Sequence, residues 1–421
     1  MALDHSGTEP RDLRDARLRL IGLIAVTAAI ALNIRPGVTT VGPELAAITA
    51  HFGAGARAGG VITAAPVICF ALVSLATPRI LARFSVRTGL FVALAITGVS
   101  LLLRPWSGLP VFVLTTCTAA IGVGLITVLL PAFIRASGST GPLVTTFTTA
   151  LQAGAALGFA SVVPLADAVG GWQWALALWA VLTPIGIGAL WRAPAPETTT
   201  PATSDSASTN PITILRDTSA VGLAIFFGLQ ALVAFVVIGW LPSVLHDAGV
   251  GTSAAGGYLG LLTCVGVPVS LVVPPLVVRS AHPARWLAGF SLCGVAGILG
   301  FLLAPGAAPL VWSLILGVGL SVFSLALTVI TVRADSPHAA LRLSSAVQGV
   351  GYLIAAIGPY AIGLFRQIAD SWTLPLTVLL VVALGQAVLA ATLDRRTPST
   401  SDEGRPGNAD DSRGTRLGST R

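Results

Sequence analysis

A lone arginine lies near the end of the first long apolar stretch of the chain. Arg35 sits in the sequence ALNIRPGVTTVGPEL (31–45), after a run (20–33) that contains no charged residue. It lies about 22 Å along a helix from residue 20, and an arginine at the centre of a membrane helix costs about 2.5–3.5 kcal/mol. Arginine is permanently charged, and its planar fork matches carboxylate-like groups. Arg35 is therefore a candidate binding group for an anionic or strongly dipolar ligand.

Two other interpretations of Arg35 stay open. Glu44 is the nearest acidic residue, but nine residues of straight helix put it on the opposite face, about 13 Å away along the axis. Pro36, Gly37 and Pro43 could bend the chain without easily closing that gap. Alternatively, Arg35 extends to the membrane interface and acts as a structural anchor.

Two polar neighbours of Arg35 are further candidates. Asn33 lies about 200° around a helix from Arg35, so it shares that face only if Pro36 kinks the chain. The alternative role for Asn33 is a hydrogen bond between helices. Thr39, four residues after Arg35, does share its face, and its alternative is a hydroxyl bonded back to its own helix.

Other polar residues recur at helical spacing in apolar runs, and polar groups in a membrane are tolerated where they face a bundle interior or a wet cavity. These residues are Thr145, Thr148 and Gln152; Ser345, Gln348 and Tyr352; Ser321, Ser324, Thr328 and Thr331; and Gln230. We expect most of the hydroxyls to serve close helix packing. Glutamine both donates and accepts hydrogen bonds, so the three glutamines are equally open to ligand binding.

The same apolar runs lack the residue sets that enzymes and ATP-driven pumps use. They contain no Ser–His–Asp set, no paired carboxylates and no phosphate-binding loop, which argues against an enzyme and against an ATP-driven pump. The four cysteines fall singly in separate runs and match no metal motif. We therefore expect no catalytic residue, no metal and no cofactor.

The elements that carry these residues are membrane helices. The chain has 421 residues, 54% hydrophobic and 10% charged, with a mean hydropathy of +0.87, whereas soluble domains carry about 25% charged residues. Long uncharged runs predict membrane-spanning helices. Twelve are expected, at roughly 20–42, 60–78, 88–103, 109–134, 142–165, 172–191, 219–245, 254–277, 286–304, 309–332, 343–365 and 372–393. The predicted fold class is an all-α integral membrane protein.

The arginines predict the orientation. All 24 basic residues are arginine. Twenty of them fall on the side of the amino terminus, three (Arg57, Arg104 and Arg366) fall on the other side, and Arg35 lies within a span. The positive-inside rule then places both termini in the cytoplasm. This distribution explains the basic balance without a nucleic-acid partner, and the all-Arg, Ala- and Gly-rich composition suggests a bacterial plasma (inner) membrane protein.

Composition also divides the chain. We expect a cytoplasmic amino-terminal segment (1–19), a six-helix bundle (20–192), a flexible cytoplasmic linker (193–218), a second six-helix bundle (219–393) and a disordered cytoplasmic tail (394–421). The linker is rich in Pro, Thr and Ser. The tail is polar and charged.

The two bundles repeat each other weakly. The stretch 59–78 corresponds to 256–275, GVGL recurs at 122–125 and 317–320, and Gln152 and Pro164 recur as Gln348 and Pro359. The four offsets lie between 195 and 197 residues. With six spans per half, the repeats run parallel, and in transporters with parallel repeats the solute site lies between the halves near the midplane.

At these residues the chain resembles the cyanate and 2-nitroimidazole transporter family of the major facilitator superfamily. LNIRPGVTTVGP (32–43) resembles its first-helix signature, and similarity runs over about 15–393. The resemblance implies uptake or export of a small, often anionic or heterocyclic solute, and it directs attention to Asn33, Arg35, Gln230 and Gln348. Glu44 departs from the pattern, and the loop 78–89 lacks the aspartate of the superfamily motif.

The sequence thus predicts a secondary active transporter that moves a small polar or anionic solute (cyanate-like, carboxylate or nitro-heterocycle) by alternating access. The expected binding residues are Arg35, Asn33, Thr39, Gln152, Gln230, Gln348 and Tyr352. The expected partners are the solute and the bilayer, with a proton or another ion as candidate coupling ion and the monomer as the expected state. Two alternatives are an exporter of apolar compounds, in which Arg35 is structural, and a membrane scaffold or sensor that does not transport.

Overall fold

A computed structural model describes residues 11–54, 56–81, 84–193, 214, 216–334 and 336–393. The regular elements of these residues are α-helices and short 3-10 helices. The predicted tail, most of the predicted linker and residues 1–10 lie outside the described residues, so the predictions made for them stay predictions.

Twelve stretches of the described chain are long and apolar enough to cross a membrane, which confirms the predicted fold class. The first half contains α1 (Arg11–Ala31), α2 (Pro36–Thr39), α3 (Leu45–His51), α4 (Ala56–Leu81), α5 (Val86–Leu103), η1 (Arg104–Trp106), α6 (Leu109–Ala136), α7 (Thr140–Val169), α8 (Trp172–Leu178), η2 (Trp179–Val181) and α9 (Leu182–Arg192). The second half contains α11 (Thr218–Asp247), α12 (Thr252–Arg279), α13 (Pro283–Leu303), α14 (Pro309–Leu320), α15 (Val322–Arg333), α16 (Pro337–Ala369) and α17 (Thr373–Thr392).

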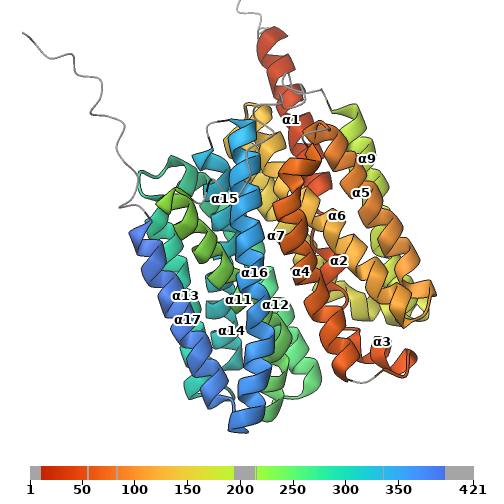
Figure 1. Cartoon of the computed structure of the whole chain (residues 1–421), viewed down its shortest axis with the longest axis vertical. Coiled ribbons are helices and arrows are strands. Elements are labelled where there is room, and N and C mark those ends of the chain that lie inside the picture. Colours follow the sequence, from red (N-terminus) through yellow and green to blue (C-terminus); the bar gives the residue numbers. More distant parts are fainter. Residues whose placement is uncertain are drawn as a thin grey trace, which may run out of the picture.

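The two halves stand side by side (Figure 1). The first half, coloured red to yellow-green, occupies the right of the view, and the second half, green to blue, occupies the left. Two pairs of long helices join them, because α7 packs against α12 and α4 packs against α16. Helix α1 begins, and α17 ends, at the top of the view, which we call the terminal end of the molecule.

The recurring GVGL stretches contact corresponding helices in the two halves, through different glycines of the stretch. A Cβ atom on Gly122 of α6 would lie 2.7 Å from the carbonyl oxygen of Ala93 in α5. A Cβ atom on Gly319 of α14 would overlap the backbone of Gly294 in α13. Helices α5 and α13 are the third spans of their halves, so the glycines bring corresponding helices together. Only glycine allows backbones to approach so closely.

Large apolar side chains cover much of the outer surface as well as the interior. Leu303, Val388 and Leu72 are 74%, 67% and 60% exposed. Soluble monomers rarely expose wide apolar surfaces, whereas lipid tails offer such side chains an apolar solvent. The exposed surface therefore agrees with the multi-pass membrane protein that hydropathy predicts.

Candidate functional site

The first span is interrupted just before Arg35. Helix α1 ends at Ala31, and a turn leads into the short helix α2, which begins at Pro36. Proline lacks the N–H that continues a helix, and its ring clashes with the carbonyl group four residues earlier, here that of Leu32. The predicted span over 20–42 is present as the membrane-crossing stretch Leu13–Thr39, and its helix is interrupted at Pro36, where the sequence allowed a kink.

Side-chain hydrogen bonds reinforce the short helix α2. The Thr39 hydroxyl donates to the Arg35 carbonyl oxygen at 3.1 Å, and the Thr40 hydroxyl donates to the Pro36 carbonyl oxygen at 2.7 Å. Nη1 of Arg104 donates to the Gly37 carbonyl oxygen at 2.8 Å. Backbone carbonyls at membrane depth require such partners. The Arg35 and Pro36 carbonyls also accept the backbone N–H groups of Thr39 and Thr40, whereas the Gly37 carbonyl takes its partner from Arg104.

Arg104 lies between helices α5 and α6 of the third and fourth spans, where the sequence placed it. Its side chain is fully buried in η1, which the sequence did not indicate. Its guanidinium carbon lies 5.9 Å from the ring centroid of Phe112. Nε and Nη2 have no hydrogen-bond partner among the described residues. Arg104 therefore supports α2 through the Gly37 carbonyl, and it does not line the cavity.

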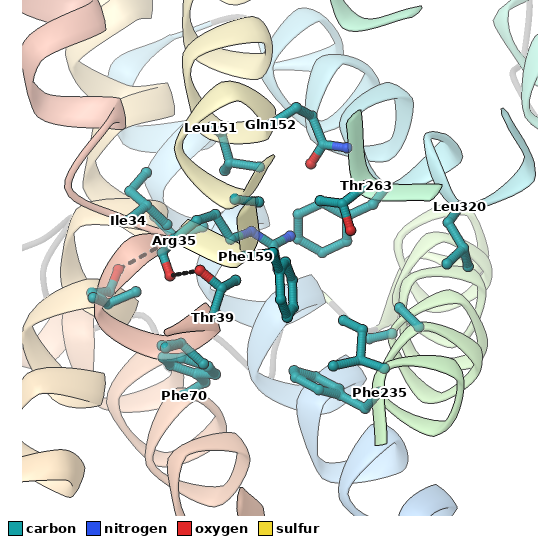
Figure 2. A pocket seen from close by; sticks show the side chains of 18 of the residues that line it. Ile34, Arg35, Thr39, Phe70, Leu151, Gln152, Phe159, Phe235, Thr263 and Leu320 are labelled. Atoms are coloured by element: carbon teal, nitrogen blue, oxygen red, sulfur yellow. Dashed lines mark hydrogen bonds between the residues drawn. The ribbon is translucent and has the colours of Figure 1, made fainter. Parts of the chain in front are cut away.

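A cavity with about 950 Å³ of empty space, including the part that opens outward, lies between the two halves. Four of the seven predicted binding residues line it, namely Arg35, Thr39, Gln152 and Tyr352. In Figure 2 the Arg35 side chain extends toward Phe159 and Thr263, with Gln152 nearby, and all four residues line the cavity. The first half and the second half both contribute to the walls.

Arg35 is the charged residue of the described lining. Its guanidinium carbon lies 4.6 Å from the ring centroid of Phe323, which belongs to α15 in the other half. Among the described residues, no carboxylate forms an ion pair with Arg35, and the guanidinium donates no hydrogen bond. Glu44 is thus not its partner. Since the side chain points into the cavity, it does not extend to the membrane interface.

Asn33 lies away from the cavity lining, inside the first half. Its Nδ2 donates to the carbonyl oxygens of Ala29 and Leu182, at 2.8 and 3.1 Å. Its Oδ1 accepts from the Thr183 hydroxyl at 3.1 Å. The amide is buried and fully occupied in joining α1 to α9. The structure therefore favours the helix–helix hydrogen bond over ligand contact for Asn33.

Gln230 occupies the equivalent place in the second half, 197 residues after Asn33. Its Nε2 donates to the Leu320 carbonyl oxygen at 3.2 Å, and its Oε1 accepts from Nε2 of Gln386 at 3.0 Å. Gln386 also donates to the Ser291 hydroxyl at 2.9 Å. In both halves, a buried amide on the first span contacts a polar side chain on the last. Gln230 does not line the cavity.

Gln348 belongs to a polar contact between the halves. Its Nε2 donates to the Ser344 hydroxyl at 2.6 Å and to the Thr127 carbonyl oxygen of α6 at 3.4 Å. Its neighbour Ser345 donates to the carbonyl oxygen of Ser74 in α4. Gln348 is fully buried and does not line the cavity.

One further contact of this kind joins α7 to α12, where the Thr148 hydroxyl lies 3.4 Å from the Ser270 carbonyl oxygen. In the described chain, the side-chain hydrogen bonds that cross between the halves all lie closer to the terminal end than Arg35 does. Each donor and acceptor falls in the part of its helix nearest that end. The halves are therefore held together on the terminal side of the cavity.

Sequence reasoning missed the aromatic part of the site. Phenylalanines from four helices line the cavity: Phe70, Phe159, Phe235 and Phe323. Nothing in their local sequence separates them from the phenylalanines of the core, because an apolar residue in an apolar helix carries no signal about which face it occupies. Their shared position becomes visible once the helices are assembled.

Glu44, the residue that departs from the expected pattern, lies outside the cavity lining. It is a buried side chain at the start of α3, beyond the first membrane span. Burial raises the pKa of its carboxyl group, and the nearby Asp167 raises it further. Glu44 therefore holds a proton to a higher pH than an exposed glutamate does.

Comparisons with known proteins agree with the membrane fold described above. A family model described as Major Facilitator Superfamily matches residues 22–359. The chain is 32% identical to the 2-nitroimidazole transporter of Escherichia coli (strain K12), over 89% of this chain and 96% of the relative. It is 27% identical to the cyanate transport protein CynX of the same organism, over 83% and 91% of the two chains.

The fold has solved counterparts. The crystal structure of FucP, a transporter described as being in the outward conformation, superimposes with a TM-score of 0.68 at 14% identity. The match covers 89% of this chain and 99% of that one. At this level of identity the likeness concerns the fold alone.

Proposed function

Because the chain belongs to the Major Facilitator Superfamily, we propose that this transporter moves a small polar or anionic solute by alternating access, with Arg35 as the group that binds the negative end of the solute. The observation that carries the proposal is the unpaired guanidinium in the cavity between the halves. Arg35 is half-buried; a cation held largely away from water without a counter-charge is costly, and an anionic solute would supply the missing charge.

Two cavity residues beside Arg35 can add hydrogen bonds. The Gln152 amide and the Tyr352 hydroxyl line the cavity and make no hydrogen bond with another described residue. Tyr352 is also close enough to Arg35 to interact electrostatically. Thr39 differs, because its hydroxyl is already bonded to the Arg35 carbonyl. We assign solute contact to Arg35, Gln152 and Tyr352, with Thr39 shaping the wall.

The position of the polar contacts between the halves supports alternating access. They close the terminal side of the cavity, whereas the lining extends along α7, α11 and α12 toward the opposite end, through Phe159, Ile238 and Leu262. A solute would thus enter from the end opposite the termini. Opening the other side requires Ser345, Gln348 and Thr148 to release their acceptors. These few weak bonds, worth about 1 kcal/mol each, make such a release accessible.

One observation favours a second candidate. Most of the cavity lining is aliphatic or aromatic, which would also suit an exporter of apolar compounds. In that case Arg35 would serve the structure through its contact with Phe323. The two candidates differ in what they predict for a charged ligand.

The test compares the thermal stability of the purified full-length protein with and without cyanate, acetate, benzoate or 2-nitroimidazole. A ligand that binds only the folded state stabilises it by RT ln(1 + [L]/Kd), about 2.7 kcal/mol at a hundredfold excess over Kd. Each probe is applied to the wild type, to Arg35→Gln and to the control Arg285→Gln. Arg285 is exposed and lies outside the cavity.

We expect at least one anion to stabilise the wild type and the control but not Arg35→Gln, and that anion to be taken up into proteoliposomes. Stabilisation by neutral compounds alone would overturn the proposal and favour the exporter of apolar compounds. An equal response of the wild type and Arg35→Gln to anions would overturn the role of Arg35.

A further inference from the structure

The aromatic lining of the cavity narrows the class of solute. Resting on the function proposed above, we infer that the solute is an aromatic anion: one planar ring that carries a single anionic group such as a carboxylate. The structure assigns the anionic group to Arg35 and the ring to the phenylalanines around it.

Aromatic side chains reach the cavity from both halves. Phe70 of α4 and Phe159 of α7 come from the first half, and Phe235, Phe323 and Tyr352 come from the second. Tyr352 joins several of them into a cluster, with ring centroids 5.3 Å from Phe70 and 6.4 Å from Phe235. A planar ring fits such a wall, because aromatic pairs prefer centroid distances of about 4.5–7 Å.

Phe159 packs against apolar residues of the second half and has no aromatic partner among the described residues. It is half-buried, lines the cavity and makes no ring contact with another aromatic residue of the described chain. In Figure 2 its ring lies beside the end of the Arg35 side chain. Phe159 is therefore a candidate stacking partner for the solute.

The contact between Arg35 and Phe323 leaves the edge of the guanidinium available to bind an anionic group. The ring covers one face of the guanidinium at 4.6 Å, so the N–H groups around its edge remain as donors. A carboxylate accepts two parallel hydrogen bonds from such an edge. This arrangement fixes the anionic group and leaves the rest of the solute among the aromatic side chains.

The polar side chains that line the cavity limit the solute to one negative charge. Three threonines line the cavity, but the hydroxyls of Thr39, Thr127 and Thr263 donate to carbonyls of their own helices, at 3.1, 2.8 and 3.0 Å. Arg35 is the cation of the described lining. A second carboxylate on the solute would therefore be buried without a counter-charge, which is costly.

The apolar wall of the cavity argues in the same direction. Most of the residues that line it are aliphatic or aromatic. A three-atom anion would contact Arg35 and leave most of the apolar wall to water. A ring covers that wall and removes the water.

The experiment measures Kd for four matched probes with the full-length protein in nanodiscs. Benzoate has a ring and a charge, cyclohexanecarboxylate has the same charge on a saturated ring, benzamide has the same ring without charge, and acetate has the charge alone. We expect benzoate to bind about three- to tenfold more tightly than cyclohexanecarboxylate, which is the size of an aromatic contact, and at least tenfold more tightly than benzamide or acetate.

Variants separate the ring from the charge. Phe159→Leu should reduce the preference for benzoate over cyclohexanecarboxylate to below twofold, with little change in the Kd of cyclohexanecarboxylate. Phe235→Leu tests the same wall from the other half. The control is Phe84→Leu, because Phe84 is exposed and lies outside the cavity, and it should leave all four constants unchanged.

The possible outcomes distinguish this inference from the function on which it rests. If benzoate and cyclohexanecarboxylate bind equally, or acetate binds as well as benzoate, and Arg35→Gln abolishes both, the aromatic inference is wrong and the anion transporter stands. If no anion binds, or benzamide binds as tightly as benzoate, both are overturned.

Discussion

The guanidinium carbon of Arg35 lies 4.6 Å from the ring centroid of Phe323, and the two residues come from opposite halves of the transporter. Arg35 follows the break in the first span, and Phe323 lies near the start of α15. A cation–π contact is worth about 0.5–2 kcal/mol and leaves the charge unneutralised. Any movement of one half against the other must change this contact, so it couples the binding group to the conformation of the cavity.

Gln152, which lines the cavity, and Gln230, which does not, should respond differently to substitution by alanine. Gln152→Ala removes a cavity amide that has no hydrogen-bond partner in the described chain, so it should weaken the Kd of a bound anion about two- to tenfold, the value of one hydrogen bond. The unfolding temperature should hardly change. Titration of the purified variant with benzoate and cyanate measures the effect.

Gln230→Ala is the matched comparison. It deprives Gln386 and the Leu320 carbonyl of their partner, which costs about 1–3 kcal/mol for a buried polar group. We expect a lower unfolding temperature and an unchanged Kd. If Gln230→Ala weakened binding without lowering stability, Gln230 would have to contact the solute in another conformation, against the placement seen here.

Gly319 should be essential for the packing of α14. A methyl group there would overlap the backbone of Gly294, and backbone atoms cannot rotate away as a side chain can. Gly319→Ala should therefore destabilise the protein by about 1–3 kcal/mol, as overpacking does, and lower its unfolding temperature. Gly289→Ala is the control, since nothing lies within 4 Å of the added Cβ; equal unfolding temperatures for the two variants would contradict the close approach of α13 and α14.

Glu44 should make stability depend on pH. Burial, helped by Asp167, raises the pKa of its carboxyl group above the ordinary value of 4.5. In the window from 4.5 up to the raised pKa, the folded protein binds more protons than the unfolded chain, so stability falls as pH rises. Above the raised pKa, Glu44 is ionised in both the folded and the unfolded state, and the folded protein bears the full free-energy cost of burying the carboxylate.

Glu44→Gln removes this titration. The variant should be more stable than the wild type at neutral pH, and the difference in unfolding temperature should shrink as the pH falls toward 4.5. Thermal unfolding of both proteins across this window measures it. A difference that stayed constant with pH would show that Glu44 does not titrate with a raised pKa.

Much of the fold follows from the sequence because lipid imposes a simple rule. Apolar runs of sufficient length become spans, and the twelve predicted spans are all present. The recurring GVGL stretches also indicated a repeat, and one glycine of each stretch packs against the third span of its half. Hydropathy does not locate breaks, however, so the sequence left a kink at Pro36 as an open possibility that only the structure decides.

The site was only partly predictable. Arg35 stands out because a charge in lipid is costly, but Asn33 and Thr39 carry similar polar signals and the structure places only Thr39 on the cavity wall. Arg104 resembled a loop residue because it lies at the end of an apolar run. The phenylalanines gave no signal, since which side of a helix faces a cavity depends on how the neighbouring helices pack.

The most direct test of the central role of Arg35 is the uptake of labelled cyanate and benzoate into proteoliposomes that contain either the wild type or Arg35→Gln. We expect the wild type to take up at least one of these anions. Arg35→Gln should remain at the level of protein-free liposomes, although its unfolding temperature without ligand stays within a few degrees of the wild type. Equal uptake by the two proteins would contradict the proposal that Arg35 binds the transported anion.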